Sequence, residues 1–580
     1  MHNIHNNLIP FFVGFALLYL KEKGTGKIAV NINLQQEFDE LAIKFNLLNP
    51  FKKKINIPTY VLILIFSQIT DIYNYGGEIL TVFLMQLNQY SKTNKNQVFT
   101  PPHIADFICQ AVNINNAKVV FDGTCGTGVF FAQSLITNKD IKVCGIEIEE
   151  STFELCKLNV LINSGAPTNI KNGCLFACED FIRETNPDII LMNPPYNAST
   201  INIPDVYKTD WKNAKKDPTR GLIFLKFISD VLKNNKKHVK AAIILPISCA
   251  IGDNKILTNL KTQLLSDNSL DAVFTLPNKI FSPSASVNTC CMFFTLGKPH
   301  INPDGTANKT FFGYFKEDGH KNKKNLGRVE QFDKNNNSIW KAIEKEWLDL
   351  YRNKIVKDGL SVMQTVTGDD EWLYEAYMKT DYSKLCEKDF IETRDNYLVY
   401  LIKSNNWQKF HDFVSESKAW KPMKCDVSKW KEFRVGDIFK SQKIKHFATI
   451  PDKKGNTPFV SSISDNNGIV DYVNAKSIKG NCITVSTNGI CFACFYQSES
   501  IVLSNDAEAL YNNNLNVYNA MFIVSVMQME KIKYGYGRKP KNNKVYDTKI
   551  KLPTDPNGEL DWLFMENYIK SLPYGDRLDG

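Results

Sequence analysis

A glycine-rich turn between an apolar strand and a helix constrains the fold of this chain more than any other feature. Residues 119–128 read Val-Val-Phe-Asp-Gly-Thr-Cys-Gly-Thr-Gly, and an apolar segment with helical character follows at residues 129–135. Glycines at this position allow the backbone to pass close to a ligand at the N-terminus of the helix. No lysine follows the glycines, which disfavours a P-loop. The pattern predicts a strand, a ligand-binding turn and a helix, in that order.

Acidic residues follow the turn at positions suited to a nucleotide-like ligand. The next expected strand, residues 142–147, ends at Glu147, about 20 residues beyond the turn, where a carboxylate can hold ribose hydroxyls. Further along, Asp180 and Phe181 lie at an expected loop, where they suit an adenine amine and the face of its ring. A lone glycine-rich turn is weak evidence for such a ligand. The ordered succession of turn and acids strengthens it.

A short polar and aromatic segment closes a further expected strand at residues 188–193. Residues 193–196 read Asn-Pro-Pro-Tyr. The side-chain oxygen of Asn193 can accept a hydrogen bond from an exocyclic amine, and the carbonyl of Pro194 can accept a hydrogen bond from the second N–H of that amine. Proline fixes φ and so holds these acceptors in place, while the Tyr196 ring can stack on the same heterocycle. A lone Asn-Pro-Pro is usually only a turn, but the preceding acids and glycines favour a binding site here.

Three elements in this order resemble a known enzyme family. Residues 97–107, Gln-Val-Phe-Thr-Pro-Pro-His-Ile-Ala-Asp-Phe, precede the glycine-rich turn, and Asn-Pro-Pro-Tyr follows it. The order resembles that of the gamma group of N6-adenine DNA methyltransferases, especially the modification subunits of type I and related type II restriction-modification systems. The resemblance implies an α/β fold with the Rossmann-like, seven-stranded sheet of S-adenosylmethionine (SAM)-dependent methyltransferases. It also implies that strands at residues 270–277 and 289–296 form a reversed hairpin that closes this sheet.

The resemblance further implies that SAM is the cofactor and that methyl transfer needs no metal. Thr100 and Pro101 would contact SAM, and Asp122 would face its amino-acid end. Glu147 would bind the ribose, and Asp180 would accept a hydrogen bond from the adenine amine. Gly123 stands where the family commonly has proline, a departure that affects the rigidity of the turn rather than its role. The expected cofactor-binding residues are Phe99, Thr100, Pro101, Asp122, Gly123, Thr124, Gly126, Thr127, Gly128, Glu147, Ile148, Asp180, Phe181 and Asn193.

The expected catalytic residues are Asn193, Pro194, Pro195 and Tyr196. Hydrogen bonds from an adenine N6 to the two oxygen acceptors favour a pyramidal nitrogen, whose lone pair can then attack the methyl group of SAM. Because N6 lies inside the duplex, the base must leave the stack, and Tyr196 would then stack on it. The resemblance implies a second aromatic wall for the base, and Phe281 matches its position. The alternative is that Phe281 packs in the core beside Ile280.

Changes of pattern divide the chain into four regions. Residues 1–90 are expected to form a helical domain, residues 91–299 the catalytic domain, residues 300–425 a helical and irregular connector, and residues 426–580 an α+β domain with short strands. Residues 430–439, Trp-Lys-Glu-Phe-Arg-Val-Gly-Asp-Ile-Phe, resemble the opening of the target-recognition domains in type I specificity subunits. Those subunits carry two such domains, and this chain shows one. The sequence therefore resembles a methyltransferase fused to a single specificity domain.

Within this last region, residues 531–541 interleave cations with aromatic rings and glycines. Such a loop can reach phosphates and base edges, and a solvated surface loop is the alternative. The candidate DNA-binding residues are Lys533, Tyr534, Tyr536, Arg538, Lys539 and Lys541.

Composition is compatible with this interpretation. The chain has 580 residues, and its 70 basic and 61 acidic residues give a formal charge of +9, a mild excess that suits a polyanionic partner. Its 14 cysteines have irregular spacing and are expected to be reduced residues of a cytoplasmic protein. The apolar run at residues 8–20 is too short to span a bilayer and lacks the features of a signal peptide, so no membrane is expected as a partner.

These features predict a site-specific methyltransferase that acts on N6 of adenine in double-stranded DNA. N4-cytosine methylation and a non-catalytic specificity or scaffold subunit are the alternatives. A second copy of the chain, or a separate restriction or specificity subunit, is left open as a further partner. Residues 205–220 follow the catalytic segment and are expected either to become ordered on DNA or to be a surface insertion without a role.

Overall fold

The structure is a computed structural model that describes residues 8–24, 33–51, 59–75, 83, 99–164, 169–211, 213–235, 237–252, 254–282, 285–315, 317–323, 327–403, 423–440, 446–535, 537–541 and 543–578. The chain divides into two compact units, Met1–Tyr377 and Met378–Gly580. The fourfold division expected from the sequence stays a prediction.

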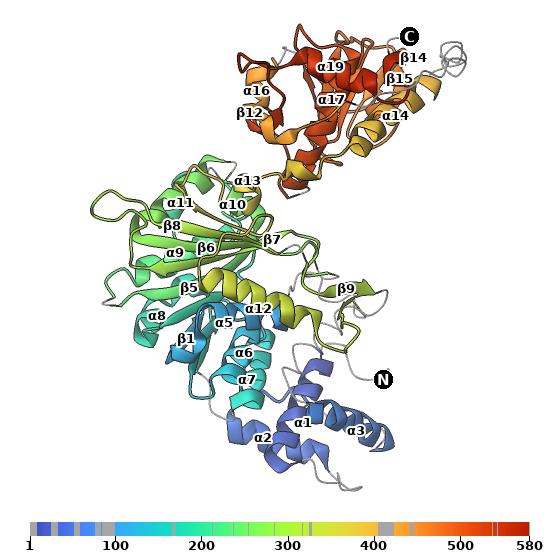
Figure 1. Cartoon of the computed structure of the whole chain (residues 1–580). Coiled ribbons are helices and arrows are strands. Elements are labelled where there is room, and N and C mark those ends of the chain that lie inside the picture. Colours follow the sequence, from blue (N-terminus) through green and yellow to red (C-terminus); the bar gives the residue numbers. More distant parts are fainter. Residues whose placement is uncertain are drawn as a thin grey trace. The chain divides into compact units, whose positions relative to one another are not determined.

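A mixed β-sheet forms the centre of the first unit (Figure 1). Its strand order is β11-β8-β6-β7-β5-β4-β1-β2-β3. The five strands from β3 to β5 are parallel, and β7 runs antiparallel to both β5 and β6. The strands are β1 (Val119–Asp122), β2 (Lys142–Glu147), β3 (Asn169–Asn172), β4 (Ile189–Met192), β5 (Val239–Pro246), β6 (Asn268–Thr275), β7 (Thr289–Leu296), β8 (Lys309–Tyr314) and β11 (Ser361–Thr365).

The doubly wound sheet and the reversed β6–β7 hairpin confirm the expected fold, but the sheet is larger than the seven strands predicted. Strand β8 pairs in parallel with β6, and β11 pairs antiparallel with β8. Both strands come from residues that the sequence assigned to a connector. The backbone of β8 pairs with β6, which would otherwise present an unpaired edge, and Phe311 and Phe312 of β8 are buried.

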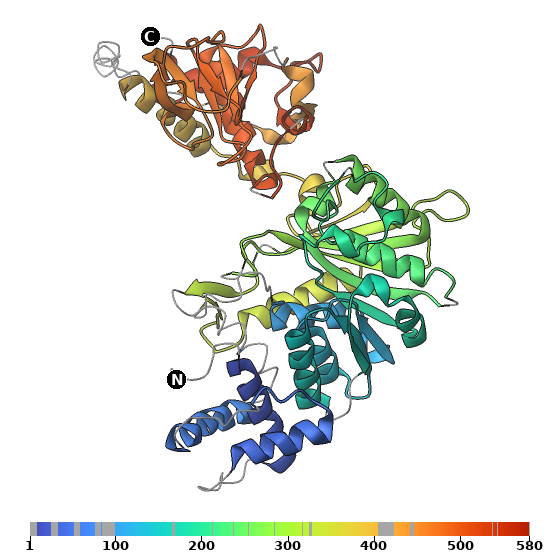
Figure 2. The same ribbon diagram turned by 180° about the vertical axis from the view of Figure 1, so that it is seen from behind.

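Helices cover both faces of this sheet (Figures 1 and 2). Helices α5 (Pro102–Ala111), α6 (Val129–Thr137), α7 (Glu150–Ser164) and α12 (Ile339–Arg352) share one hydrophobic core with one face of the strands. Helices α8 (Glu179–Thr185), α9 (Leu222–Val231) and α11 (Lys255–Asp267) pack against one another on the other face. The same unit contains two short helices, α10 (Ile247–Ile251) and α13 (Tyr374–Tyr377), and a β-hairpin of β9 (His320–Lys323) and β10 (Gly327–Glu330).

The N-terminal helices α1 (Ile9–Lys23), α2 (Leu34–Phe45) and α3 (Thr59–Tyr75) bury aromatic side chains in a second hydrophobic core of this unit. Residues Leu155, Leu158 and Leu161 of α7 belong to the same core, so these helices rest on the helical layer that covers the sheet. In the described part of the chain, no helix has the length and apolar character needed to cross a membrane.

The second unit has the α+β character expected from its sequence. Three small sheets have the strand orders β12-β20, β13-β18-β14-β15 and β17-β16-β19. The almost fully buried helix α17 (Val517–Gln528) lies within their common core. Among the described residues of this unit, the strands are β12 (Lys431–Arg434), β13 (His446–Phe447), β14 (Lys454–Val460), β15 (Ile469–Val473), β16 (Cys482–Ser486), β17 (Cys494–Gln497), β18 (Val502–Ser504), β19 (Ala507–Leu510) and β20 (Lys549–Leu552). The other α-helices described there are α14 (Glu387–Lys403), α16 (Val435–Ile438), α18 (Lys544–Asp547) and α19 (Trp562–Ser571).

Candidate active site

Asn193 lies at the carboxyl end of β4, between the ends of β1 and β5. Its Nδ2 donates a hydrogen bond of 3.1 Å to Oγ1 of Thr100, and its Oδ1 accepts one of 2.8 Å from the hydroxyl of Tyr196. Thr100 is buried and stands just before α5. The Asn193 side chain therefore joins the Phe-Thr-Pro segment to the Asn-Pro-Pro-Tyr segment, which are far apart in the sequence.

The Tyr196 hydroxyl contacts the same oxygen that the sequence assigns to a base amine. Burial raises the pKa of Tyr196 well above its ordinary value, so the hydroxyl remains a neutral donor. For the ring to lie flat on a base that is bonded to Asn193 Oδ1, this hydroxyl has to give up its place there. In this structure the two groups that would recognise a base thus satisfy each other.

The glycine-rich turn lies at the ends of β1 and β2. The backbone N–H of Thr124 donates to Oδ1 of Asp122, at 2.9 Å, and that of Gly126 donates to Oε2 of Glu147, also at 2.9 Å. Gly128 has φ of 82°, and a Cβ there would lie 2.8 Å from Sγ of Cys156. This position therefore requires glycine for both conformation and space.

The two carboxylates of the turn are buried without a cationic side chain. Burial raises the pKa of Asp122 to about 8 and also raises the pKa of Glu147. Neither forms an ion pair with a lysine or arginine among the described residues. A ligand that carries positive charge would offset this cost. SAM has an ammonium group and a sulfonium, so the residues present fit it.

The other expected cofactor residues differ in their surroundings. Phe99 and Thr127 are buried, and Ile148, next to Glu147, is an exposed apolar side chain that could face a ring. Asp180 is different, because its side chain is 93% exposed and lies 3.6 Å from Arg183 in the first turn of α8. The Phe181 ring has Lys171 Nζ 5.8 Å from its centroid. No contact with the other candidates is found for Asp180 within the described ranges, and its role stays a prediction.

Phe281, the candidate second wall, is only 3% exposed and lies in a core cluster together with Ile280. This placement agrees with the packing alternative, and a base could reach the ring only if the segment after β6 moved.

The candidate DNA-binding loop of the second unit is partly engaged in internal contacts. Lys533 pairs with the fully buried Glu530. The Tyr534 ring stacks on Phe492, with centroids 4.6 Å apart. The Arg538 guanidinium lies over the Tyr534 ring, 4.9 Å from its centroid. Lys541 is exposed, Lys539 is partly buried, and Tyr536 lies outside the described residues.

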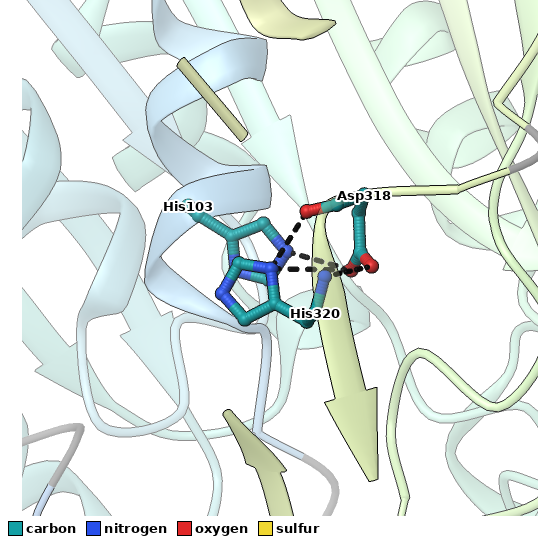
Figure 3. A group of neighbouring side chains, drawn as sticks. All are labelled: His103, Asp318 and His320. Carbon is teal, nitrogen blue, oxygen red and sulfur yellow. Dashed lines mark hydrogen bonds and ion pairs between the residues drawn. The ribbon is translucent and has the colours of Figure 1, made fainter. Parts of the chain in front are cut away.

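Sequence reasoning missed a cluster of ionisable side chains near the start of α5 (Figure 3). Nε2 of His103 donates to Oδ2 of Asp318 at 3.0 Å, Arg328 pairs with Oδ1, and the His103 and His320 rings stack 4.1 Å apart at 18°. Burial lowers the pKa of His103 to about 4. Because the guanidinium already neutralises Asp318 and the stacked rings cannot both aim a lone pair at one point, the cluster suits a hydrogen-bonded network better than a metal ion. No sequence spacing links residues so far apart.

The strand order, the reversed β7 and the glycine-rich turn after β1 together define a Rossmann-like methyltransferase fold. The protein-family model described as N-6 DNA Methylase matches residues 71–367, more than half of the chain, and the chain belongs to this family. Membership implies SAM as the methyl donor. Residues 427–573 match the model described as Type I restriction modification DNA specificity domain.

Curated relatives match the chain in parts. The type II restriction enzyme and methyltransferase RM.BcgI of Heyndrickxia coagulans is 29% identical over 349 residues, which are 56% of this chain and 50% of the relative. The specificity subunit S.BcgI of the same organism is 30% identical over 187 residues, 31% of this chain and 53% of the relative. The type I EcoEI methylase subunit of Escherichia coli is 25% identical over 254 residues, 40% and 50% of the two chains. The chain thus spans about half the length of these relatives.

Among solved structures, the type IIG restriction endonuclease BpuSI is 11% identical with a TM-score of 0.48, and the match covers 98% of this chain and 73% of that one. The type I methyltransferase subunit from Streptococcus thermophilus is 18% identical with a TM-score of 0.42, over 61% and 76% of the two chains. Likenesses of this size carry no argument about function.

Proposed function

We propose that this protein transfers a methyl group from SAM to N6 of adenine in double-stranded DNA, at a site chosen by its C-terminal domain. The Asn193 side chain is the observation that carries the proposal. It lies at the carboxyl edge of the sheet, where it contacts Thr100 on one side and Tyr196 on the other. Family membership supports the same activity, and the specificity-domain match supports DNA as the substrate.

The cofactor would lie over the glycine-rich turn. Asp122 would pair with its ammonium group and Glu147 with its ribose, and the exposed Ile148 would face its adenine. When bound, SAM supplies a methyl group made electrophilic by the sulfonium charge.

The chain's own residues position and polarise the target base. Asn193 Oδ1 and the Pro194 carbonyl would accept hydrogen bonds from the two N6–H groups, which withdraws the nitrogen lone pair from the ring and directs it towards the methyl group. The bond from N6 to the methyl carbon forms as the bond from that carbon to sulfur breaks, and the methylated nitrogen then releases one proton to solvent. The base must first leave the duplex, at a cost of a few kcal/mol. Stacking on Tyr196 offsets about 1–3 kcal/mol of it. Nothing in this scheme requires a nucleophilic side chain, since positioning and electrostatics carry the reaction.

Partners and location extend this proposal. One specificity domain can read an asymmetric site alone, or two copies of the chain can read two half-sites; a separate restriction subunit is a further option. All fourteen cysteines lie among the described residues and none is in a disulfide, which supports the cytoplasmic location.

Methylation of DNA by the full chain tests the proposal. DNA from a host that expresses the protein is sequenced by long reads and scored for modified bases, and purified protein is assayed with tritiated SAM. N6-methyladenine at a defined site supports the proposal, and N4-methylcytosine would support the closest alternative. A protein that transfers no label even to DNA from a host without the mark would be a scaffold instead.

Two variants connect the activity to the site. Asn193→Ala should abolish transfer while SAM binding, measured by calorimetry, persists. Asn302→Ala is the matched control, because it removes the same side chain from an exposed turn between β7 and β8, at the opposite edge of the sheet. Equal activity in both variants would remove Asn193 from the mechanism.

A further inference from the structure

Residues 197–220 form a folded excursion between Tyr196 and α9. The structure describes all of them except residue 212. The two ends of the excursion are held together, since the N–H of Asp217 donates to the Ala198 carbonyl at 2.9 Å and the Thr200 hydroxyl donates to the Ala214 carbonyl at 2.7 Å. These internal hydrogen bonds give the described part of the segment a defined fold.

The excursion returns to the chain directly beside the catalytic segment. Asp217 is buried and accepts hydrogen bonds of 2.7 Å from the N–H groups of Thr219 and Gly221. Gly221 has φ of 98°, and a Cβ there would lie 3.0 Å from Cγ of Pro194. The return point thus packs on Pro194, which fixes the whole excursion relative to Asn193.

Its inner side is packed, whereas its outer side presents apolar and cationic groups. Ile203 and Trp211 are buried, but Ile201 is 85% exposed and Val206 is 75% exposed. Single exposed apolar side chains are common on protein surfaces. What distinguishes these two is that they belong to a folded segment whose return point, Gly221, packs on Pro194 of the catalytic segment.

The charge of the outer side is positive. Lys215, Lys216 and Arg220 are exposed, and within the described residues none of them pairs with a carboxylate. Asp205 is paired with Lys208 at 2.7 Å, which leaves Asp210 as the other exposed acid described on the excursion.

We propose that the described residues of the excursion, 197–211 and 213–220, form the surface on which duplex DNA lies while an adenine enters the site. Ile201 and Val206 contact the bases beside the vacated position, and the three cations face phosphates. The inference rests on the proposed function. A base that leaves the stack exposes apolar faces of its neighbours, and apolar side chains inserted at unstacked steps stabilise such openings in other DNA-binding proteins.

Single-turnover methylation of two duplexes tests this surface. Both carry the recognition sequence that long-read sequencing identifies. They differ only in the base opposite the target adenine, which is thymine in one duplex and a mismatched base in the other. Ile201→Ser, Val206→Ser and the double variant are compared with wild type. Ile301→Ser is the control, because Ile301 is also exposed, at 58%, but follows β7 at the opposite edge of the sheet.

Opening the base pair costs a few kcal/mol. If the apolar side chains offset about 1.36 kcal/mol of this cost, the Ile201 and Val206 variants should methylate the paired adenine about tenfold more slowly. The mismatch lowers the opening cost, so the same variants should approach the wild-type rate there. Ile301→Ser should match wild type on both duplexes.

Two results would overturn the inference: wild-type rates for the double variant on the paired duplex, or an equal loss on both duplexes, which would indicate damage to the site itself. A wild-type protein that methylates neither duplex would instead refute the proposed function. In a separate arm, Lys215→Ala with Lys216→Ala should weaken binding of the paired duplex and make the affinity less dependent on salt. An unchanged salt dependence would remove these cations from the interface.

Discussion

Replacing Tyr196 with phenylalanine separates the two roles that its side chain could have. The ring can stack on a base, whereas the hydroxyl donates a 2.8 Å hydrogen bond to Asn193 Oδ1, the oxygen that a base amine would use. Tyr196→Phe keeps the ring and removes the bond that an entering base has to break.

The magnitude follows from the worth of one hydrogen bond. A net contribution of about 0.5–1.5 kcal/mol corresponds to a factor of about two to thirteen in rate, at 1.36 kcal/mol for each tenfold change. We expect Tyr196→Phe to methylate faster than wild type by a factor in this range. Tyr196→Ala also loses stacking worth about 1–3 kcal/mol, and we expect it to be about 5- to 160-fold slower than Tyr196→Phe.

The assay is single-turnover transfer of a tritiated methyl group from saturating SAM to an unmodified duplex that carries the recognised sequence. SAM affinity, measured separately, controls for changes in cofactor binding. A Tyr196→Phe rate below that of wild type would refute this reasoning, since it would give the hydroxyl a positive role in the reaction.

Three further predictions concern the cofactor turn and the second unit. Because burial raises the pKa of Asp122 from 3.8 to about 8, its contribution to the stability of SAM-free protein is fully present below the lower value and is lost as pH rises from about 4 to about 8; Asp122→Asn should flatten the fall in Tm across this range, and an unchanged pH profile would contradict the assignment. Gly128→Ala should lower the free energy of unfolding in urea by about 1–3 kcal/mol and should weaken SAM binding. Adding Cys156→Ala should restore only part of the lost stability, because the backbone strain at φ of 82° persists. Lys541→Ala should reduce the slope of DNA affinity against salt by about one with Tm unchanged, whereas Lys533→Ala should lower Tm, because Lys533 pairs with the buried Glu530; the reverse pattern would exchange their roles.

Local pattern was enough to predict the strands that hold the site. The segments at β1, β2 and β4 are apolar runs that end in a glycine, an acid or a proline, and their parallel pairing brings Asp122, Glu147 and Asn193 to one edge of the sheet. The antiparallel β7 was expected from family resemblance rather than from spacing.

Contacts between distant segments explain what the sequence did not predict. Strand β8 lies between turn-rich segments, and only its pairing with β6 identifies it as part of the sheet. The His103–Asp318 bond joins residues 215 positions apart. The bond between Tyr196 and Asn193 depends on a side-chain rotamer, and sequence patterns do not contain that information.

The two added strands also bear on how the catalytic unit can be isolated. A fragment that stops at residue 299 would lack β8 and β11 and would leave the backbone groups of β6 open to pairing with another chain. Such a fragment should aggregate during expression, whereas one that continues through α13 retains the full sheet and should remain monodisperse.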